Sequence, residues 1–149
     1  IGNIIVSLIL AMSFIYAGLV FKNTEPLIIP ALLAFGLTLI REIVKDLADI
    51  KGDKSAGLMT FPIVYGKKKT IILCTILSLF LGIGSFIPFL TGYYNTFYGI
   101  SLLLMVEIPL AVVVISLLNK PVILTAKRGS KLLKFCTLGG LLSIYIGTL

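Results

Sequence analysis

Charged residues are scarce in this sequence: they make up 13% of its 149 residues, whereas 58% are hydrophobic. Soluble domains are about half apolar and about a quarter charged, so a water-soluble globular protein is nearly excluded. A disordered chain is excluded as well, because disorder requires low hydrophobicity and high charge. Cysteine is also rare. Cys74 and Cys136 both lie in apolar runs, which indicates neither a disulfide framework nor metal-ligand spacing.

What is present instead is a set of long apolar stretches. They predict five helices, at residues 4–21, 27–50, 70–90, 97–118 and 132–149, although only residues 27–40 of the second are apolar. A helix needs about 20 residues to cross the hydrocarbon layer. The runs are continuous and do not alternate, which argues against strands. We therefore expect an all-α transmembrane helical bundle that forms one membrane domain over residues 1–149.

The basic residues are distributed unevenly along the chain. Twelve of the thirteen Lys and Arg residues lie in residues 41–69 or 120–134. The first range separates the apolar runs of the second and third predicted helices, and the second range connects the fourth helix to the fifth. The positive-inside bias makes that side cytoplasmic. We expect a multi-pass protein of the cell membrane with a functional site open to the cytoplasm, and the net charge of +7 then reports topology and not nucleic-acid binding. Because the sequence opens on Ile1 and ends inside an apolar run, we expect it to be part of a longer protein.

All three aspartates of the chain, Asp46, Asp49 and Asp53, lie within eight residues. On one continuous helix at about 100° per residue, they and Glu42 would share a face about 60° wide. Like charges stacked in this way destabilise a helix unless something compensates them. Carboxylate oxygens suit Mg²⁺, which often shares its ligands with substrate phosphates, and Lys45 flanks the same face. The alternative is an ordinary solvated helix end with mixed charges.

Depth in the membrane favours the functional interpretation of this segment. The apolar run at residues 27–40 covers only about 21 Å at 1.5 Å per residue, against a hydrocarbon core of about 30 Å. The charges that follow it therefore begin below the level of the headgroups. Charges at that depth are costly unless they face a protein interior or a watery cavity. We infer that a polar cavity opens here.

A longer pattern contains these aspartates. It consists of Arg41, Glu42, Lys45, Asp46, Asp49, Gly52, Asp53, Gly57, Thr60, Pro62 and Gly66. This pattern resembles the second aspartate-rich motif of the UbiA superfamily of intramembrane prenyltransferases, and the Gly2-Asn3 pair resembles the start of the family's fifth helix. By this resemblance the chain corresponds to helices five to nine of a nine-helix fold. The Arg-Glu-x-x-Lys-Asp form and the Met59–Pro62 stretch are most similar to the archaeal ether-lipid enzymes of the family.

The resemblance implies an enzyme in which two aspartate-rich motifs hold a prenyl diphosphate through Mg²⁺ and pass the prenyl group to a lipophilic acceptor. In the archaeal lipid enzymes the donor is geranylgeranyl diphosphate and the acceptor is geranylgeranylglyceryl phosphate. The implied metal and catalytic residues are Asp46, Asp49 and Asp53, with Lys45 on the diphosphate. The implied substrate-binding residues are Lys45, Arg41, Glu42, Lys54 and Asn3. The first motif is absent, so we expect these 149 residues alone to be inactive.

Two other functions stay open from the sequence. One is a member of the same superfamily with an aromatic acceptor, such as a quinone precursor or chlorophyllide, or with a haem acceptor. The other is a membrane transporter or ion channel whose carboxylate face binds a cation. The role of Glu107, two residues before Pro109, is open between function and structure. Asn3 is expected to bond between helices, with substrate contact as the alternative, and Gly139-Gly140 to allow close helix packing.

Overall fold

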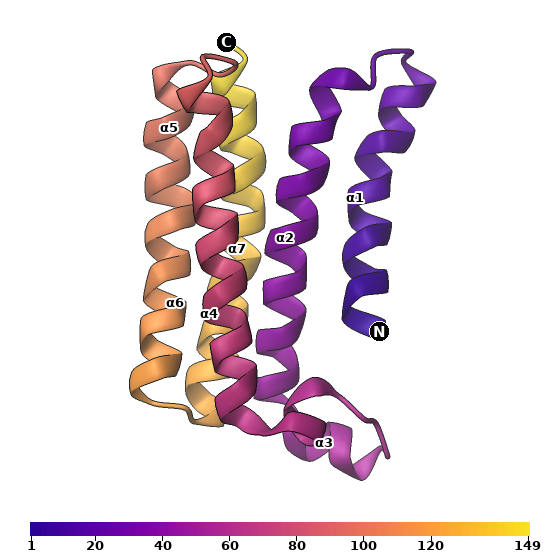
Figure 1. The fold of residues 1–149 in the computed structure, drawn as a ribbon, viewed down its shortest axis with the longest axis vertical. Coiled ribbons are helices and arrows are strands. Elements are labelled where there is room, and N and C mark those ends of the chain that lie inside the picture. The colour runs from indigo at the N-terminus through magenta and orange to yellow at the C-terminus, as the bar shows by residue number, and fades with distance from the viewer.

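The computed structural model describes residues 1–149 and contains helices but no strands. The elements are α1 (Gly2–Val20), α2 (Glu25–Ala48), α3 (Ile50–Ser55), α4 (Phe61–Leu90), α5 (Thr96–Leu102), the π-helical segment η1 (Leu103–Glu107), α6 (Ile108–Asn119) and α7 (Ile123–Gly147). The long helices stand side by side, with α1 at one edge of the bundle and α6 at the other (Figure 1). The predicted all-α bundle is confirmed.

Four helical stretches are long and apolar enough to cross a membrane: α1, α2, α4 and the continuous path of α5, η1 and α6. The fifth, α7, runs beside them but carries four cations in its first half, at positions 127, 128, 131 and 134. Large apolar side chains cover the outside of the bundle. Ile9, Phe80 and Phe135, on three different helices, are each at least 66% exposed. Such a surface suits lipid and not water.

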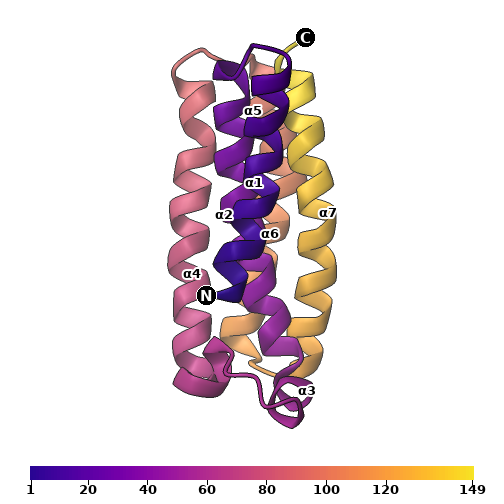
Figure 2. The ribbon, with the colours of Figure 1, turned by 90° about the vertical axis from the view of Figure 1, so that its right-hand side faces the viewer.

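Helix α2 lies at the centre of the packing and contacts α1, α4 and α7. Leu37, Ile40, Val44 and Leu47 recur at helical spacing and are all buried, so they form the stripe that faces the other helices. Helix α1, in contrast, packs chiefly against α2, which lies behind it in Figure 2 with α4 and α7 on either side. Few residues of α1 are buried as a result.

Small residues allow the helices to approach closely. A Cβ at Gly129 of α7 would lie 2.9 Å from a side-chain carbon of Val113, and one at Gly139 would lie 2.8 Å from the Cβ of Met105. Glycine at such positions is typical of helix interfaces in membranes. The structure thus places Gly139 where the sequence analysis expected close packing.

The two ends of the bundle differ in charge. One end holds the α1–α2 turn, the α4–α5 turn and the C-terminus (Figure 1). The other holds α3 and the α6–α7 connection, and we call residues 41–69 and 120–134 together the charged end. These two ranges contain twelve of the thirteen cations, as the alternation of the predicted helices requires.

Two helices begin earlier than the sequence analysis predicted. Helix α4 starts at Phe61, not at residue 70, and α7 starts at Ile123, not at residue 132. Their first turns carry charged residues, including exposed Lys67–Lys69, that a search for apolar runs leaves out. Pro62 suits the first turn of α4, and Gly66 (φ 82°, ψ 162°) then interrupts the helix before its long straight part begins.

Candidate functional site

The aspartate-bearing segment is not one continuous helix. Helix α2 ends at Ala48, Asp49 takes a non-helical conformation (φ −117°, ψ 23°), and the short α3 begins at Ile50. The expectation of a helix to residue 50 and beyond, with all the carboxylates on one narrow face, is therefore wrong. The Asp49 carboxylate instead folds toward Gly52, where a Cβ would lie 2.6 Å from its Oδ1 atom. A side chain at position 52 would require the Asp49 carboxylate to move.

Asp46 is fixed by a residue from another helix. The Asn3 side chain near the start of α1 donates a hydrogen bond of 2.7 Å from Nδ2 to Asp46 Oδ2. The expected bond between helices is thus present, and it ends on an aspartate of the motif. This contact places the start of α1 at the charged end of α2 and orients one of the two Asp46 oxygens.

Glu42 is buried and has two cationic partners. Its Oε1 atom accepts from Arg41 at 3.0 Å, and its Oε2 atom accepts from Lys45 at 3.0 Å. Glu42 therefore does not add a free carboxylate to the aspartates, as the shared face had suggested. It holds two cations beside them, and the Lys45 side chain is still 58% exposed.

Three polar atoms near this segment are buried without a hydrogen-bond partner. They are Asp53 Oδ2, Arg41 Nε and Thr60 Oγ1. Buried polar groups in proteins are normally satisfied, and an unpartnered charged oxygen is especially costly. Asp49 and Lys54 are exposed, and neither side chain forms a hydrogen bond or ion pair. The segment therefore has unused capacity to bind a ligand.

The donor atoms fit a hard divalent cation in kind but are not assembled into a site. Carboxylate oxygens are the ligands that Mg²⁺ prefers, and Asp53 Oδ2 lacks a partner. However, no three His, Cys, Asp or Glu side chains lie close enough together to hold a metal ion. The metal roles of Asp46, Asp49 and Asp53 stay predictions.

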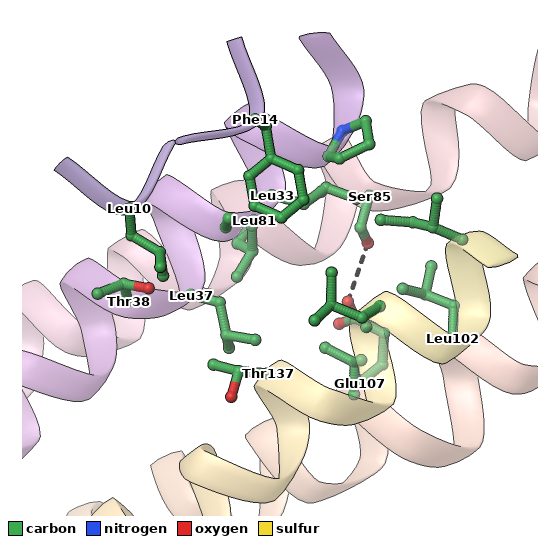
Figure 3. A pocket seen from close by; sticks show the side chains of 16 residues that line it. Leu10, Phe14, Leu33, Leu37, Thr38, Leu81, Ser85, Leu102, Glu107 and Thr137 are labelled. Carbon is green, nitrogen blue, oxygen red and sulfur yellow. Dashed lines mark hydrogen bonds between the residues drawn. The ribbon is translucent and has the colours of Figure 1, made fainter. Parts of the chain in front are cut away.

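A second polar feature lies in the middle of the bundle. A cavity of about 180 Å³ opens among α1, α2, α4, the end of α5, η1 and α7, with mostly apolar walls that include Phe14, Leu37 and Leu102 (Figure 3). Glu107 and Ser85 lie at one side of it and point toward each other. Cavities of this kind bind apolar molecules when their few polar groups are satisfied.

Glu107 has a specific set of neighbours in this cavity. Ser85 donates a hydrogen bond of 2.9 Å to Glu107 Oε1, and the Tyr98 hydroxyl donates one of 2.7 Å to the Ser85 carbonyl. Glu107 ends η1, and α6 begins at the next residue, Ile108. Pro109 follows, and a proline has no N–H to continue the α-helical bonding. Glu107 stood out in the sequence, whereas Ser85 did not, because it is one polar residue in a long apolar run. Tyr98 was given no function from the sequence, because an aromatic residue at a helix turn is typical of the membrane interface.

The fold and these residues indicate a multi-pass α-helical membrane protein with an acidic segment at one end and an apolar cavity within the bundle. Comparison with known proteins narrows the class. The UbiA prenyltransferase family matches residues 1–128. The chain therefore belongs to the UbiA prenyltransferase family, and the resemblance identified from the sequence is confirmed.

Individual relatives agree with this assignment. The chain is 40% identical over 71% of its length to digeranylgeranylglyceryl phosphate synthase of Methanosphaera stadtmanae, and 37% identical over 99% of its length to that of Saccharolobus solfataricus. A solved structure of digeranylgeranylglyceryl phosphate synthase matches 98% of the chain with a TM-score of 0.89 and 33% identity. The chain spans 38% and 52% of these two relatives and 52% of the solved chain, about half of the longer proteins.

Proposed function

We propose that this chain is the second half of an integral membrane prenyltransferase, corresponding to helices five to nine of a nine-helix membrane domain. The enzyme would transfer a prenyl group from geranylgeranyl diphosphate to geranylgeranylglyceryl phosphate in the synthesis of archaeal ether lipids. Relatives over the whole chain support this substrate pair, since they are digeranylgeranylglyceryl phosphate synthases. The observation that carries the proposal is the aspartate segment, with its unpartnered Asp53 oxygen, at the end of a bundle that contains an apolar cavity.

The aspartates and the neighbouring cations would hold the diphosphate in two different ways. Asp46, Asp49 and Asp53 would hold Mg²⁺, which neutralises the charge that develops on the diphosphate as the allylic C–O bond breaks. Lys45 and Arg41, held in place by Glu42, add positive charge on the same side. Asn3 is a positioning residue, because it orients Asp46 through its 2.7 Å bond. Lys54 is free to contact a phosphate.

The cavity would serve the apolar part of the substrates. Its walls are almost entirely hydrocarbon, so a prenyl chain that enters it keeps apolar surface away from water on both sides of the contact. Exclusion of water also protects an allylic cation from hydrolysis before the acceptor captures it. The positive-inside bias supports a site that opens to the cytoplasm, where Lys and Arg gather at the charged end.

The test uses the full-length protein that contains this chain. Asp46→Asn and Asp49→Asn should each lower Mg²⁺-dependent release of diphosphate from geranylgeranyl diphosphate by about 10²- to 10³-fold, the usual loss for one electrostatic group in a catalytic site. Glu25→Gln, which removes an exposed carboxylate at the opposite end of α2, should leave the rate within about twofold. Cation flux that depends on Asp46, without diphosphate release, would instead make the protein a transporter.

A further inference from the structure

A second cavity lies at the charged end, away from the aspartates. It has a volume of about 450 Å³ and is lined only by α6, α7 and their connection. Its polar lining residues are Ser116, Asn119, Lys120, Thr125 and Arg128. The connection that closes it lies at the lower left of the bundle in Figure 1. This volume is within the range of about 300–1,000 Å³ that small-molecule sites occupy.

The polar side chains around this cavity have no partner within the protein. None of the five donates or accepts a side-chain hydrogen bond, and neither Lys120 nor Arg128 forms an ion pair. Other hydroxyls of α7 behave differently: Thr137 and Ser143 bond to carbonyls of their own helix. The groove is therefore lined by hydrogen-bond donors, from two helices and their connection, that no group of the protein engages.

The charge of this region selects an anion. Residues 108–149 contain five cations and no carboxylate, and both ion pairs of the chain are made by Glu42 on α2. Lys and Arg can only donate, so the free groups of Lys120 and Arg128 match the oxygens of a phosphate. This helical hairpin contains no Asp or Glu side chain that could pair with Lys120 or Arg128 in place of a bound anion.

The surface beside the groove is apolar. Val112 and Leu132 line the groove itself, and Ile115 and Phe135 are more than half exposed on the outer sides of α6 and α7. A ligand that suits both parts has an anionic head and a hydrocarbon chain. Basic pockets between transmembrane helices on the positively charged side bind anionic lipid headgroups in this way.

We propose that the groove between α6 and α7 is a binding site for an anionic membrane phospholipid. Its phosphate lies between Lys120 and Arg128, with Ser116, Asn119 and Thr125 completing the donors, and its chains follow the outer surface of the two helices. The site shares no residue with the aspartate segment. It therefore stands whether or not the proposed prenyl transfer is correct.

The experiment measures lipid binding to the detergent-purified full-length protein by native mass spectrometry. The probes are dioleoylphosphatidylglycerol, which is anionic, and dioleoylphosphatidylcholine, which is neutral overall. Each cation near an anionic lipid increases its binding constant by about fivefold. The double variant K120Q/R128Q should therefore lower the ratio of phosphatidylglycerol to phosphatidylcholine binding by about 25-fold. The matched control is K131Q/K134Q, which removes two exposed cations of α7 that do not line the groove, and it should keep the preference within about threefold.

Each other outcome overturns the proposal. Equal losses in the two double variants would mean diffuse attraction to a basic surface, and no loss in either would mean that lipid binds elsewhere. Inorganic phosphate separates a lipid from a free anion: it should not displace phosphatidylglycerol at millimolar concentration, because the chains contribute to binding. Displacement by phosphate alone would show that the groove binds a soluble anion. The uncharged variant S116A/T125V should weaken phosphatidylglycerol binding by about fivefold, since two neutral hydrogen bonds worth at least about 0.5 kcal/mol each are lost.

Discussion

Carboxylates occur in two contrasting environments in this bundle. At the charged end, Asp49 is exposed without a partner and Asp53 carries a buried oxygen without one. In the middle of the bundle, Glu107 stands alone among apolar side chains, and Ser85 on another helix donates a hydrogen bond of 2.9 Å to its Oε1 atom. The first group therefore has no partner within the protein, whereas Glu107 has one.

The difference shows how the two sites can be told apart. An unsatisfied buried charge lowers stability, so it persists where a ligand supplies the missing partner. A satisfied carboxyl that bridges two helices contributes to the packing of those helices. We therefore expect substitutions at the charged end to affect function more than stability, and substitutions around Glu107 to do the reverse.

The largest effect is expected at Asp53. If Asp53 holds Mg²⁺ as proposed, Asp53→Asn should lower the rate of prenyl transfer by about 10²- to 10³-fold, because the substitution removes one of the metal ligands. Stability should stay within about 0.5 kcal/mol or rise, because the substitution removes a buried charge that has no partner. Activity and the thermal unfolding midpoint of the full-length protein in detergent measure the two effects. A parallel fall of both would make Asp53 a structural residue and would break the comparison.

A smaller effect is expected at Asn3. Asn3→Ala should raise the Mg²⁺ concentration needed for half-maximal activity by about tenfold, as is usual when a partner that orients a metal ligand is removed. The control is Ser7→Ala one turn further along α1, since Ser7 bonds only to the Asn3 carbonyl of its own helix. A Mg²⁺ titration separates the roles. If Asn3→Ala lowers the unfolding midpoint but leaves the Mg²⁺ dependence unchanged, Asn3 only ties α1 to α2.

The sequence was informative about the fold because lipid leaves few choices. Continuous apolar runs predicted the helices, and the alternation of Lys and Arg predicted which connections share an end. The helix break at Asp49 could not be foreseen, since the aspartates repeat at helical spacing and neither proline nor glycine precedes the break. In the folded chain the Asp49 carboxylate lies beside Gly52, a contact that spacing along a helix does not predict.

The candidate site was predictable in residue type but not in pairing. The motif put the aspartates, Lys45 and Arg41 on one segment, and the structure shows that Glu42 is the partner of both cations. Pairing depends on rotamers and burial, which spacing along a helix does not determine. Ser85 was missed for a related reason. It contacts Glu107, which is 22 residues away in the sequence and on another helix, and a single sequence does not reveal contacts of this kind.

The smallest effect is expected at Gly82, where the comparison can be sharpened. A Cβ at Gly82 would lie 2.8 Å from Glu107 Oε2, so Gly82→Ala must displace the carboxyl that Ser85 holds. We expect a loss of about 1 kcal/mol in the free energy of unfolding, within the range of helix–helix hydrogen bonds in membranes. In a Glu107→Ala background the same change should be neutral or stabilising, because alanine favours the helix over glycine by about 1 kcal/mol.

Gly84 provides the matched control for this double-mutant cycle. It lies on the same helix two residues away, and nothing lies within 4 Å of the Cβ that alanine would add. Gly84→Ala should therefore have the same effect with and without Glu107, whereas Gly82→Ala should show a coupling of about 1 kcal/mol. Prenyl transfer should change by less than about threefold in all of these variants if Glu107 serves packing. If substitution of Glu107 abolishes activity and leaves the free energy of unfolding unchanged, Glu107 is a functional carboxyl group like the aspartates and not a packing residue.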